Sequence, residues 1–248
     1  MYMTLEFARQ GRSSPATFAE QAFARIHADI LSAKLRPDEK MHIERLSAAY
    51  GVGSTPLREA LSKLSAMDLL RSEGQRGFRV APVPIQDLLD ITKTRSWIEG
   101  VALRAAIRSG DRVWEAEILA AAHRLKKCPK MTGDRLTDDW NSENRLFHDA
   151  LVACCHSKQM MMFRAHLYDL SERYRQLSVK NGLAGRDVDA EHQSIMDAVL
   201  SRDADTAVEL TEDHFIETTR IILSGELGDP AEVDRTVATL RAEIKHDV

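Results

Sequence analysis

Residues 51–70 have the sequence GVGSTPLREALSKLSAMDLL, which is typical of a helix that projects from the protein surface into a groove of DNA. Its opening GVGSTP combines a tight glycine turn, hydroxyl side chains able to cap a helix, and a proline suited to the first helical turn. Apolar residues then recur at helical spacing, namely Leu57, Ala60, Leu61 and Leu64, and Leu69 and Leu70 close the helix. The opposite face carries side chains of the kinds that reach phosphates and base edges, which are Thr55, Arg58, Ser62 and Lys63. Taken alone, the pattern fits a surface helix with a solvated basic face equally well.

The flanking sequence favours a winged helix-turn-helix. Residues 43–50 (IERLSAAY) predict a second short helix, and Gly51 breaks the chain between the two helices. Residues 71–80 (RSEGQRGFRV) predict two strands around a glycine-containing loop. The apolar spacing within residues 18–31 predicts a first helix that supports this pair.

Residues 18–82 resemble the N-terminal domain of the GntR family of bacterial transcription regulators. The resemblance lies in residues 35–37 (LRP), 46–48 (LSA), 51–52 (GV), 55–61 (TPLREAL), Leu64, Gly74 and 77–80 (GFRV). It implies binding to a double-stranded DNA operator. The family commonly has Ser-Arg before Thr-Pro, where this chain has Gly53 and Ser54, so the family's usual operator sequence need not apply. We expect DNA contacts from the predicted recognition helix and the wing, made by Ser54, Thr55, Arg58, Lys63 and Arg76.

The distribution of charge agrees with a DNA-binding head on an acidic body. The 248-residue chain has a net charge of −4, but residues 1–81 contain 12 Lys and Arg against 9 Asp and Glu, whereas residues 82–248 contain 22 against 29. No segment approaches the roughly 20 apolar residues of a membrane span, and no signal peptide is recognisable, so we expect a cytoplasmic protein. Cys128, Cys154 and Cys155 lack a metal-binding spacing and are expected to be free thiols.

The remaining chain predicts an all-α antiparallel bundle. Residues 1–17 suggest a flexible N-terminal arm, the DNA-binding domain spans 18–81, and Pro-Val-Pro at 82–84 predicts a stiff hinge. Helical patterns follow over residues 85–109, 111–127, 134–155, 157–179, 186–201 and 203–224, the last ended by Gly225. We therefore expect a mostly α protein, with a winged helix-turn-helix followed by a bundle over 85–225. Residues 226–248 suggest a charged C-terminal tail that forms a short exposed helix. Residues 85–224 resemble the FCD ligand-sensing domain of FadR-like GntR regulators.

Three histidines predict a metal site inside the bundle. His148, His192 and His214 lie on three different predicted helices, each on the apolar side, and neutral imidazoles bind Zn, Ni and similar divalent transition metals. The alternative is that each is a hydrogen-bonded core histidine. The spacing resembles the metal-binding pattern of FCD domains, which implies a fourth ligand at Asn144, four residues before His148. That family commonly has Asp at this position, and a neutral carbonyl is a weaker ligand.

Arg95 is a candidate effector-binding residue. It falls on an otherwise apolar stripe with Leu88, Ile91, Ile98 and Ala102, and a buried guanidinium requires a partner. One interpretation is a salt bridge to Glu99 or to an acid on a neighbouring helix. The other is a clamp for a carboxylate, which Arg binds bidentately. An arginine on this helix is similarly associated with the effector pocket in FCD proteins, which implies a small carboxylate effector.

The leading hypothesis is a homodimeric regulator, by default a repressor, whose operator binding a small organic acid modulates from beside the metal. A metal-responsive repressor without an organic effector is the first alternative. A metal that only braces the bundle is another. A metal-dependent hydrolase is disfavoured because no Glu or Asp stands at general-base spacing from the histidines, so we expect no enzyme activity.

Overall fold

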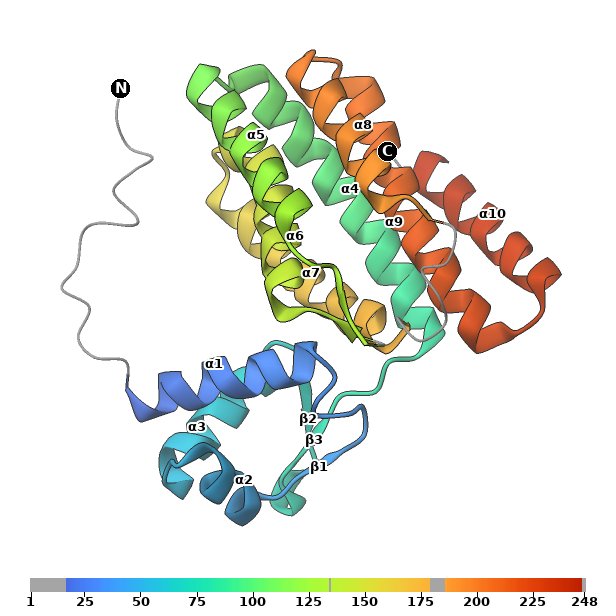
Figure 1. The fold of residues 1–248 in the computed structure, drawn as a ribbon. Coiled ribbons are helices and arrows are strands. Elements are labelled where there is room, and N and C mark those ends of the chain that lie inside the picture. The colour runs from blue at the N-terminus through green and yellow to red at the C-terminus, as the bar shows by residue number, and fades with distance from the viewer. Residues whose placement is uncertain (1–16, 134, 179–185, 247–248) are drawn as a thin grey trace. The chain divides into compact units, whose positions relative to one another are not determined.

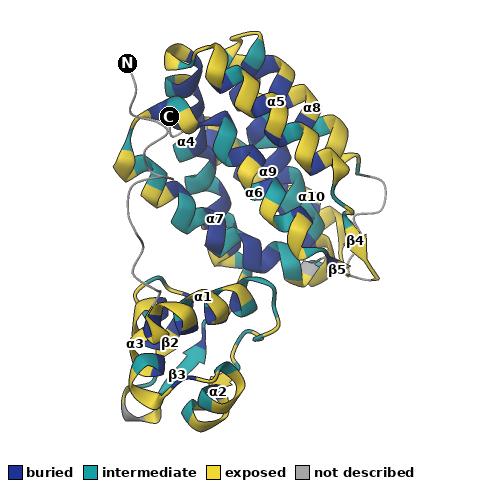
Figure 2. Ribbon diagram, turned by 60° about the vertical axis from the view of Figure 1, so that its left-hand side comes forward, coloured by how far each residue is buried: buried dark blue, intermediate teal, exposed yellow. Residues whose placement is uncertain are grey.

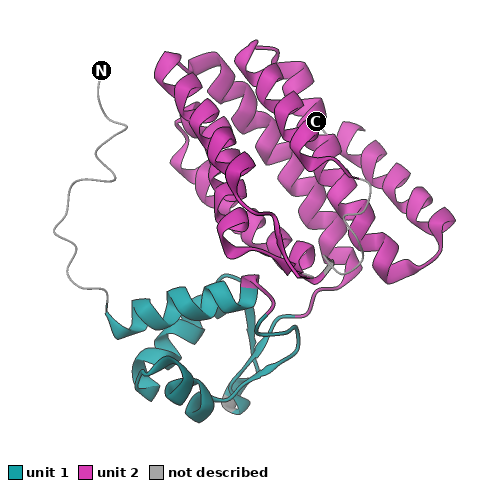
Figure 3. Ribbon diagram, in the orientation of Figure 1, with its two compact units in different colours: residues 1–30, 34–81 teal, residues 31–33, 82–248 magenta. Residues whose placement is uncertain are grey.

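The computed structural model describes residues 17–133, 135–178 and 186–246. Residues 1–16 of the expected N-terminal arm lie outside the described part. The chain divides into two compact units, residues 1–30 with 34–81 and residues 31–33 with 82–248 (Figure 3). The helices and small sheets confirm the expected mostly α fold class, with a winged helix-turn-helix before a helical domain.

The first unit is built from three helices and a small sheet (Figure 1). Helix α1 (Phe18–Leu31), helix α2 (Ile43–Tyr50) and helix α3 (Ser54–Ser65) surround a core that includes Ile26, Ile30, Leu57, Leu61 and Leu64. Gly51 ends α2 in the left-handed conformation, with φ of 67°, which makes the tight turn into α3.

Two details of the recognition helix differ from the sequence prediction. Gly53 is the N-cap of α3 and no side chain caps the helix, so the expected hydroxyl cap is wrong. The helix ends at Ser65 rather than at Leu70, because Asp68 adopts a positive φ of 57° and turns the chain. Leu70 instead begins strand β2 (Leu70–Ser72).

The wing has the two predicted strands and a third that the sequence did not indicate. Strand β2 pairs antiparallel with β3 (Phe78–Val80), with Leu70 opposite Val80 and Ser72 opposite Phe78. A 3-10 turn, η1 (Gly74–Arg76), joins them. The two-residue strand β1 (Lys40–Met41) pairs with the other edge of β3, so the order is β1-β3-β2.

The second unit is a bundle with α4 (Ile85–Ser109) at its centre, packed against α7 (Lys158–Ser178) and α9 (Ala204–Leu227). Helix α5 (Arg112–Lys127) packs against α6 (Asp138–Leu151), and α8 (Val188–Leu200) packs against α9. Figure 2 shows that the helices are buried on the sides that face one another and exposed on the outside, as the apolar periodicity requires.

Some predicted boundaries of the bundle helices are wrong. A hairpin of β4 (Met131–Thr132) and β5 (Arg135–Leu136) occupies the expected start of the third helix, and α6 begins after Thr137, whose side chain accepts a hydrogen bond from the Trp140 amide. That helix ends at Leu151, and a short 3-10 segment, η2 (Ala153–Cys155), follows. Helix α9 continues through Gly225, since a helix tolerates one glycine at modest cost, and ends at Leu227, where Gly228 caps it in the left-handed conformation.

The expected exposed tail is in fact a packed helix. Helix α10 (Pro230–His246) buries an apolar stripe against α9 and α4, formed by Val233, Val237, Leu240 and Ile244. Trp97 of α4 also donates its indole N–H to the Ile244 carbonyl at 3.2 Å. The stripe recurs every three to four residues, a helical period that the surrounding charged residues obscure in the sequence.

No helix in the described residues is both long and apolar enough to cross a membrane. The three cysteines are free thiols, as the sequence predicts.

Candidate functional site

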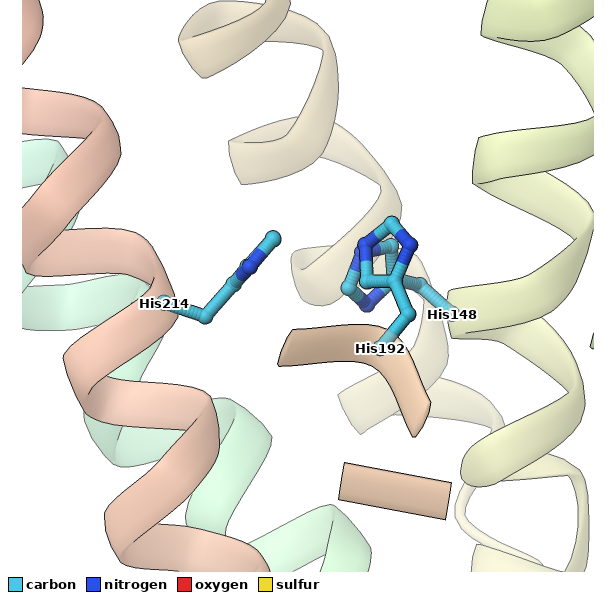
Figure 4. A group of neighbouring side chains, drawn as sticks. All are labelled: His148, His192 and His214. Atoms are coloured by element: carbon cyan, nitrogen blue, oxygen red, sulfur yellow. The ribbon is translucent and has the colours of Figure 1, made fainter. Parts of the chain in front are cut away.

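The three predicted histidines meet inside the bundle. His148 of α6, His192 of α8 and His214 of α9 are all buried. Their ring centroids lie 5.2 Å apart for His148 and His192, 5.3 Å for His148 and His214, and 4.9 Å for His192 and His214. One ring nitrogen from each lies within 4.8 Å of the others, and Figure 4 shows the rings converging from three helices. We call these residues the histidine triad.

Burial keeps the triad uncharged. It holds the pKa of His148 and of His192 well below the ordinary imidazole value, and neighbouring imidazoles lower both further. Burial also lowers the pKa of His214 to about 4, although its bond to Glu191 acts in the opposite direction. Each ring therefore offers a neutral nitrogen, which is the form that binds a metal.

The unpartnered atoms of the triad fit a metal ion. His148 Nδ1 and both ring nitrogens of His192 are buried without a hydrogen-bond partner. Such orphans are costly in a core, at roughly 1–3 kcal/mol each, unless something binds them. Metal–nitrogen distances of about 2.1 Å place the nitrogens of a tetrahedral site roughly 3.4 Å apart. The three nitrogens here lie within 4.8 Å of one another, so the rings would close around an ion. The interpretation as ordinary hydrogen-bonded core histidines does not account for His192.

Asn144 lies beside the triad, one turn before His148 on α6. It is buried, and its side-chain amide donates to the Tyr168 hydroxyl at 3.3 Å. It lines the same cavity as His148 and His214. Its position is therefore compatible with a fourth ligand contributed through the amide oxygen.

Sequence reasoning missed a carboxylate next to the triad. Glu191 Oε2 lies 2.7 Å from His214 Nδ1, so a carboxylate contacts the triad although none was identified at general-base spacing in the sequence. Arg186 binds both oxygens of this carboxylate, at 2.7 and 2.6 Å, and donates to the His214 carbonyl at 2.8 Å. Although burial alone would raise it, the bonds from His214 and Arg186 hold the pKa of Glu191 at about 2. The carboxylate is bound at both oxygens and fixes the His214 ring through Nδ1, which leaves Nε2 as the nitrogen that could bind a metal.

Arg95 lines a cavity together with His148, Asn144 and His214, which we call the Arg95 cavity. Its guanidinium lies over the Phe215 ring at 3.9 Å and donates to Ser171 Oγ at 3.0 Å, while its buried Nε has no partner. Burial lowers the pKa of Arg95 to about 10, so the group stays charged at neutral pH.

The salt bridge between Arg95 and Glu99 is not formed. Glu99 accepts from Arg164 Nε at 2.8 Å, and both side chains are almost completely buried. Arg164 also binds Asp149, the residue after His148. Because Glu99 is paired with Arg164, the guanidinium of Arg95 retains capacity for another anion.

A second cavity adjoins the first, and we call it the Trp140 cavity. Three cationic side chains line it, from Lys130, Arg175 and Arg186, and none of the described acidic residues does. The two cavities share Asn144, Arg175, His214 and Thr218, so they approach the triad from neighbouring directions. Each has about 40 Å³ of free volume, which suits a small ligand.

The expected DNA-contacting residues lie at the surface of the first unit. Ser54, Thr55 and Arg58 are exposed on the first turns of α3, and Arg76 is exposed in the wing. Lys63 is also exposed, but its ammonium binds Glu59 at 2.8 Å. Arg58 is therefore the better-placed cation of the helix.

Comparison with known protein families matches both units. A model described as bacterial regulatory proteins of the gntR family matches residues 18–80, and a model of the FCD domain matches residues 90–217. The chain belongs to the GntR family. This pairing confirms the predicted FadR-like architecture of a GntR helix-turn-helix with an FCD domain.

Relatives of this GntR protein are transcription regulators. The uncharacterized HTH-type transcriptional regulator BphR of Paraburkholderia xenovorans (strain LB400) is 35% identical over 206 residues, covering 82% of this chain and 84% of that protein. The HTH-type transcriptional repressor GlaR of Escherichia coli (strain K12) is 36% identical over 206 residues, covering 81% and 94%. The chain is accordingly a DNA-binding transcription regulator and not an enzyme.

Solved structures share the fold of this GntR regulator. E. coli McbR/YncC has a TM-score of 0.71 at 17% identity, covering 85% of this chain and 99% of that one. A putative transcriptional regulator GntR from Rhodococcus sp. RHA1 has a TM-score of 0.68 at 16% identity, covering 83% and 97%. At these identities the likeness concerns the fold alone.

Proposed function

We propose that this GntR regulator is a homodimeric repressor whose hold on its operator is weakened when a small carboxylic acid binds beside a divalent transition metal in the bundle. The observation that carries the proposal is one cavity that brings together the unpartnered Nδ1 of His148, a member of the histidine triad, and the Arg95 guanidinium, whose Nε has no partner. A regulator named as a repressor is among its relatives.

The histidine triad would hold the metal, with Asn144 as a weak fourth ligand. Zn or Ni suits imidazole nitrogen, and a bound ion supplies a Lewis-acid position at which an oxygen ligand can bind. Glu191 fixes the His214 ring through Nδ1, and Arg186 holds Glu191 in place. The chain therefore provides the outer hydrogen bonds that a stable metal site needs.

Arg95 would orient the acid. Its Nε is free, and its Nη1 is held by Ser171, so the guanidinium is presented in a fixed direction within the cavity. A carboxylate there gains a charge-assisted hydrogen bond in a setting that excludes most water. The small free volume favours short acids over long-chain ones.

The DNA-binding side of the proposal rests on α3 and the wing. Arg58 and Thr55 would contact DNA from the recognition helix, with Ser54 at its start, Lys63 farther along and Arg76 from the wing. In a dimer, two such helices would enter successive major grooves. A bound acid that favours another spacing of the two DNA-binding domains would weaken the binding of one domain to its half-site. Each lost base contact would reduce the binding free energy by about 1–3 kcal/mol.

The metal content of the purified, untagged protein tests the bundle site. We expect about one transition-metal ion per chain in the wild type and none in His148→Ala, because the triad provides the strong ligands. His123→Ala, which removes an exposed histidine of α5, should keep the metal. Equal metal content in His148→Ala and the wild type would contradict the site.

Effector binding is tested with Arg95→Ala on the zinc-loaded protein. Short acids such as lactate and succinate should raise the wild-type melting temperature and release DNA in a mobility-shift assay, and Arg95→Ala should lose both responses. If Zn²⁺ alone changes DNA affinity and acids do nothing, the protein is a metal-responsive repressor. If His192→Ala lowers the stability of the protein yet leaves its response to acids intact, the metal has only a structural role in the bundle.

A further inference from the structure

Three cavities in the described part of the chain touch the histidine triad, and they differ in charge. Among the residues that the structure describes, the Trp140 cavity is lined by three cations and no acid. The Arg95 cavity is lined by Arg95, Arg175 and Glu172, and the Glu172 carboxylate is already bound by Arg175 at 2.5 Å. Arg175 and Arg186 are paired with acids, but Arg95 in one cavity and Lys130 in the other form no ion pair with a described residue, so each cavity favours an anion over a divalent cation.

The third cavity lies between α5 and α8 and has the opposite balance. It is the largest of the three, at about 390 Å³, and we call it the α5–α8 groove. Its charged lining residues are Asp187, Asp189 and Lys126, and its inner wall includes Leu125, Phe147 and Met196. Acidic groups at the mouth of an apolar-walled cleft focus the field and concentrate cations there.

His192 joins this groove to the triad. Its side chain lines the groove, belongs to the triad, and lies within 4.9 Å of His214 between ring centroids. The side chain is buried, and neither of its ring nitrogens has a hydrogen-bond partner. An ion that enters the groove therefore meets a free nitrogen ligand whose ring already reaches the other two histidines.

We propose that the metal ion reaches the triad through the α5–α8 groove, by way of His192, while the carboxylate effector uses the Arg95 and Trp140 cavities. The inference rests on the proposed metal site. The separation follows from charge, since the Trp140 cavity presents the Lys130 ammonium beside two arginines that are paired with Glu172 and Glu191. In the groove, Asp189 forms no ion pair with any described residue and can attract a divalent cation. The separation also means that a bound acid would not block exchange of the metal.

A matched pair of substitutions on α8 tests the route by obstruction. Gln193 is exposed and lines the groove, whereas its neighbour Ser194 is exposed and lines none of these cavities. Transfer of Zn²⁺ from the holoprotein to an excess of a chromogenic chelator should slow several-fold in Gln193→Trp and stay unchanged in Ser194→Trp. Equilibrium Zn²⁺ affinity should be the same in all three proteins, because the ligands are untouched.

A second pair tests the route by charge. Zn²⁺ uptake by the chelator-treated full-length chain at low salt should slow by about tenfold in Asp189→Lys and accelerate in Lys126→Glu, with both effects shrinking at high salt. Asp189 and Lys126 are both exposed, so neither substitution should prevent folding. Lys130→Glu in the Trp140 cavity should change the rate of uptake less than Asp189→Lys does, although Lys130 interacts with Asp189 electrostatically.

The outcomes separate this inference from the proposed metal site. Zn²⁺ that binds but exchanges at the wild-type rate in Gln193→Trp and Asp189→Lys overturns the groove route alone. Acceleration in Lys130→Glu, without an effect at Asp189, would place the route in the Trp140 cavity and overturn the inference as well. A wild type that binds no Zn²⁺ overturns the metal site itself.

Discussion

At the scale of single residues, Arg58 is the side chain on which the DNA-binding hypothesis most depends. It is exposed on α3, and its neighbour Lys63 is engaged with Glu59. Arg58→Ala should weaken operator binding by about 1–3 kcal/mol, or roughly 5- to 150-fold, at fixed salt. The measurement is a DNA titration by fluorescence anisotropy, with Arg112→Ala, an exposed arginine of the bundle, as control. Unchanged affinity in Arg58→Ala would exclude the proposed docking of α3.

A second prediction at this scale concerns Glu191. Its only described role is to bind His214 and Arg186, so Glu191→Ala should weaken Zn²⁺ binding by about 10- to 100-fold, as loss of an outer hydrogen bond to a metal ligand does. Glu191→Gln retains an oxygen that can accept from Nδ1 and should lose less. Competition with a chelator measures both affinities. If the two variants bind Zn²⁺ equally well as the wild type, Glu191 does not position His214.

At the scale of elements, helix α10 is an integral part of the bundle. Val237 is buried among apolar residues of the second unit, whereas the adjacent Ala238 is exposed. Val237→Asp should destabilise the protein by several kcal/mol because it buries a carboxylate without a partner, and Ala238→Asp should cost well under about 1 kcal/mol. Chemical denaturation followed by circular dichroism gives the difference. Similar stability of the two variants would mean that α10 is detached in solution.

At the scale of the whole molecule, the proposed dimer fixes the spacing of its DNA half-sites. Two recognition helices on one face of DNA require half-site centres separated by whole helical turns of about 10 base pairs. Insertion of about five base pairs into the operator should therefore abolish tight binding, and insertion of about ten should restore most of it. A mobility-shift series measures this. Equal binding to all three spacings would indicate that each chain binds DNA alone.

The distribution of charge over the whole chain agrees with a DNA-binding first unit and a ligand-binding second unit. The excess of basic residues before residue 82 and of acidic residues after it suits one unit for DNA and leaves the other to its ligands. Within the acidic unit, however, cations gather in the cavities at the triad. The average charge of a domain is therefore a poor guide to the charge of its binding site.

Much of the fold follows from local sequence. The glycine turn before α3 and the apolar periods of α4 and α7 predict the elements because helical spacing is a local property. Local sequence did not predict the β4–β5 hairpin. It also placed the end of α3 too late, at Leu70 instead of Ser65, and predicted an exposed helix where α10 is packed. In each case the local preference for helix or for exposure is weak, and a turn or a tertiary contact determines the structure instead, such as the packing of Val237 and Ile244.

The sequence by itself determined which side chains could form the site, since His148, His192 and His214 each lie on the apolar side of a helix. Only the tertiary structure decided which of them meet and what surrounds them. The pairing of Glu191 with His214, the capture of Glu99 by Arg164, and the acidic groove at His192 all join residues on different helices or loops. Periodicity assigns a residue to a face of its own helix, but the partner across the interface depends on how the helices pack.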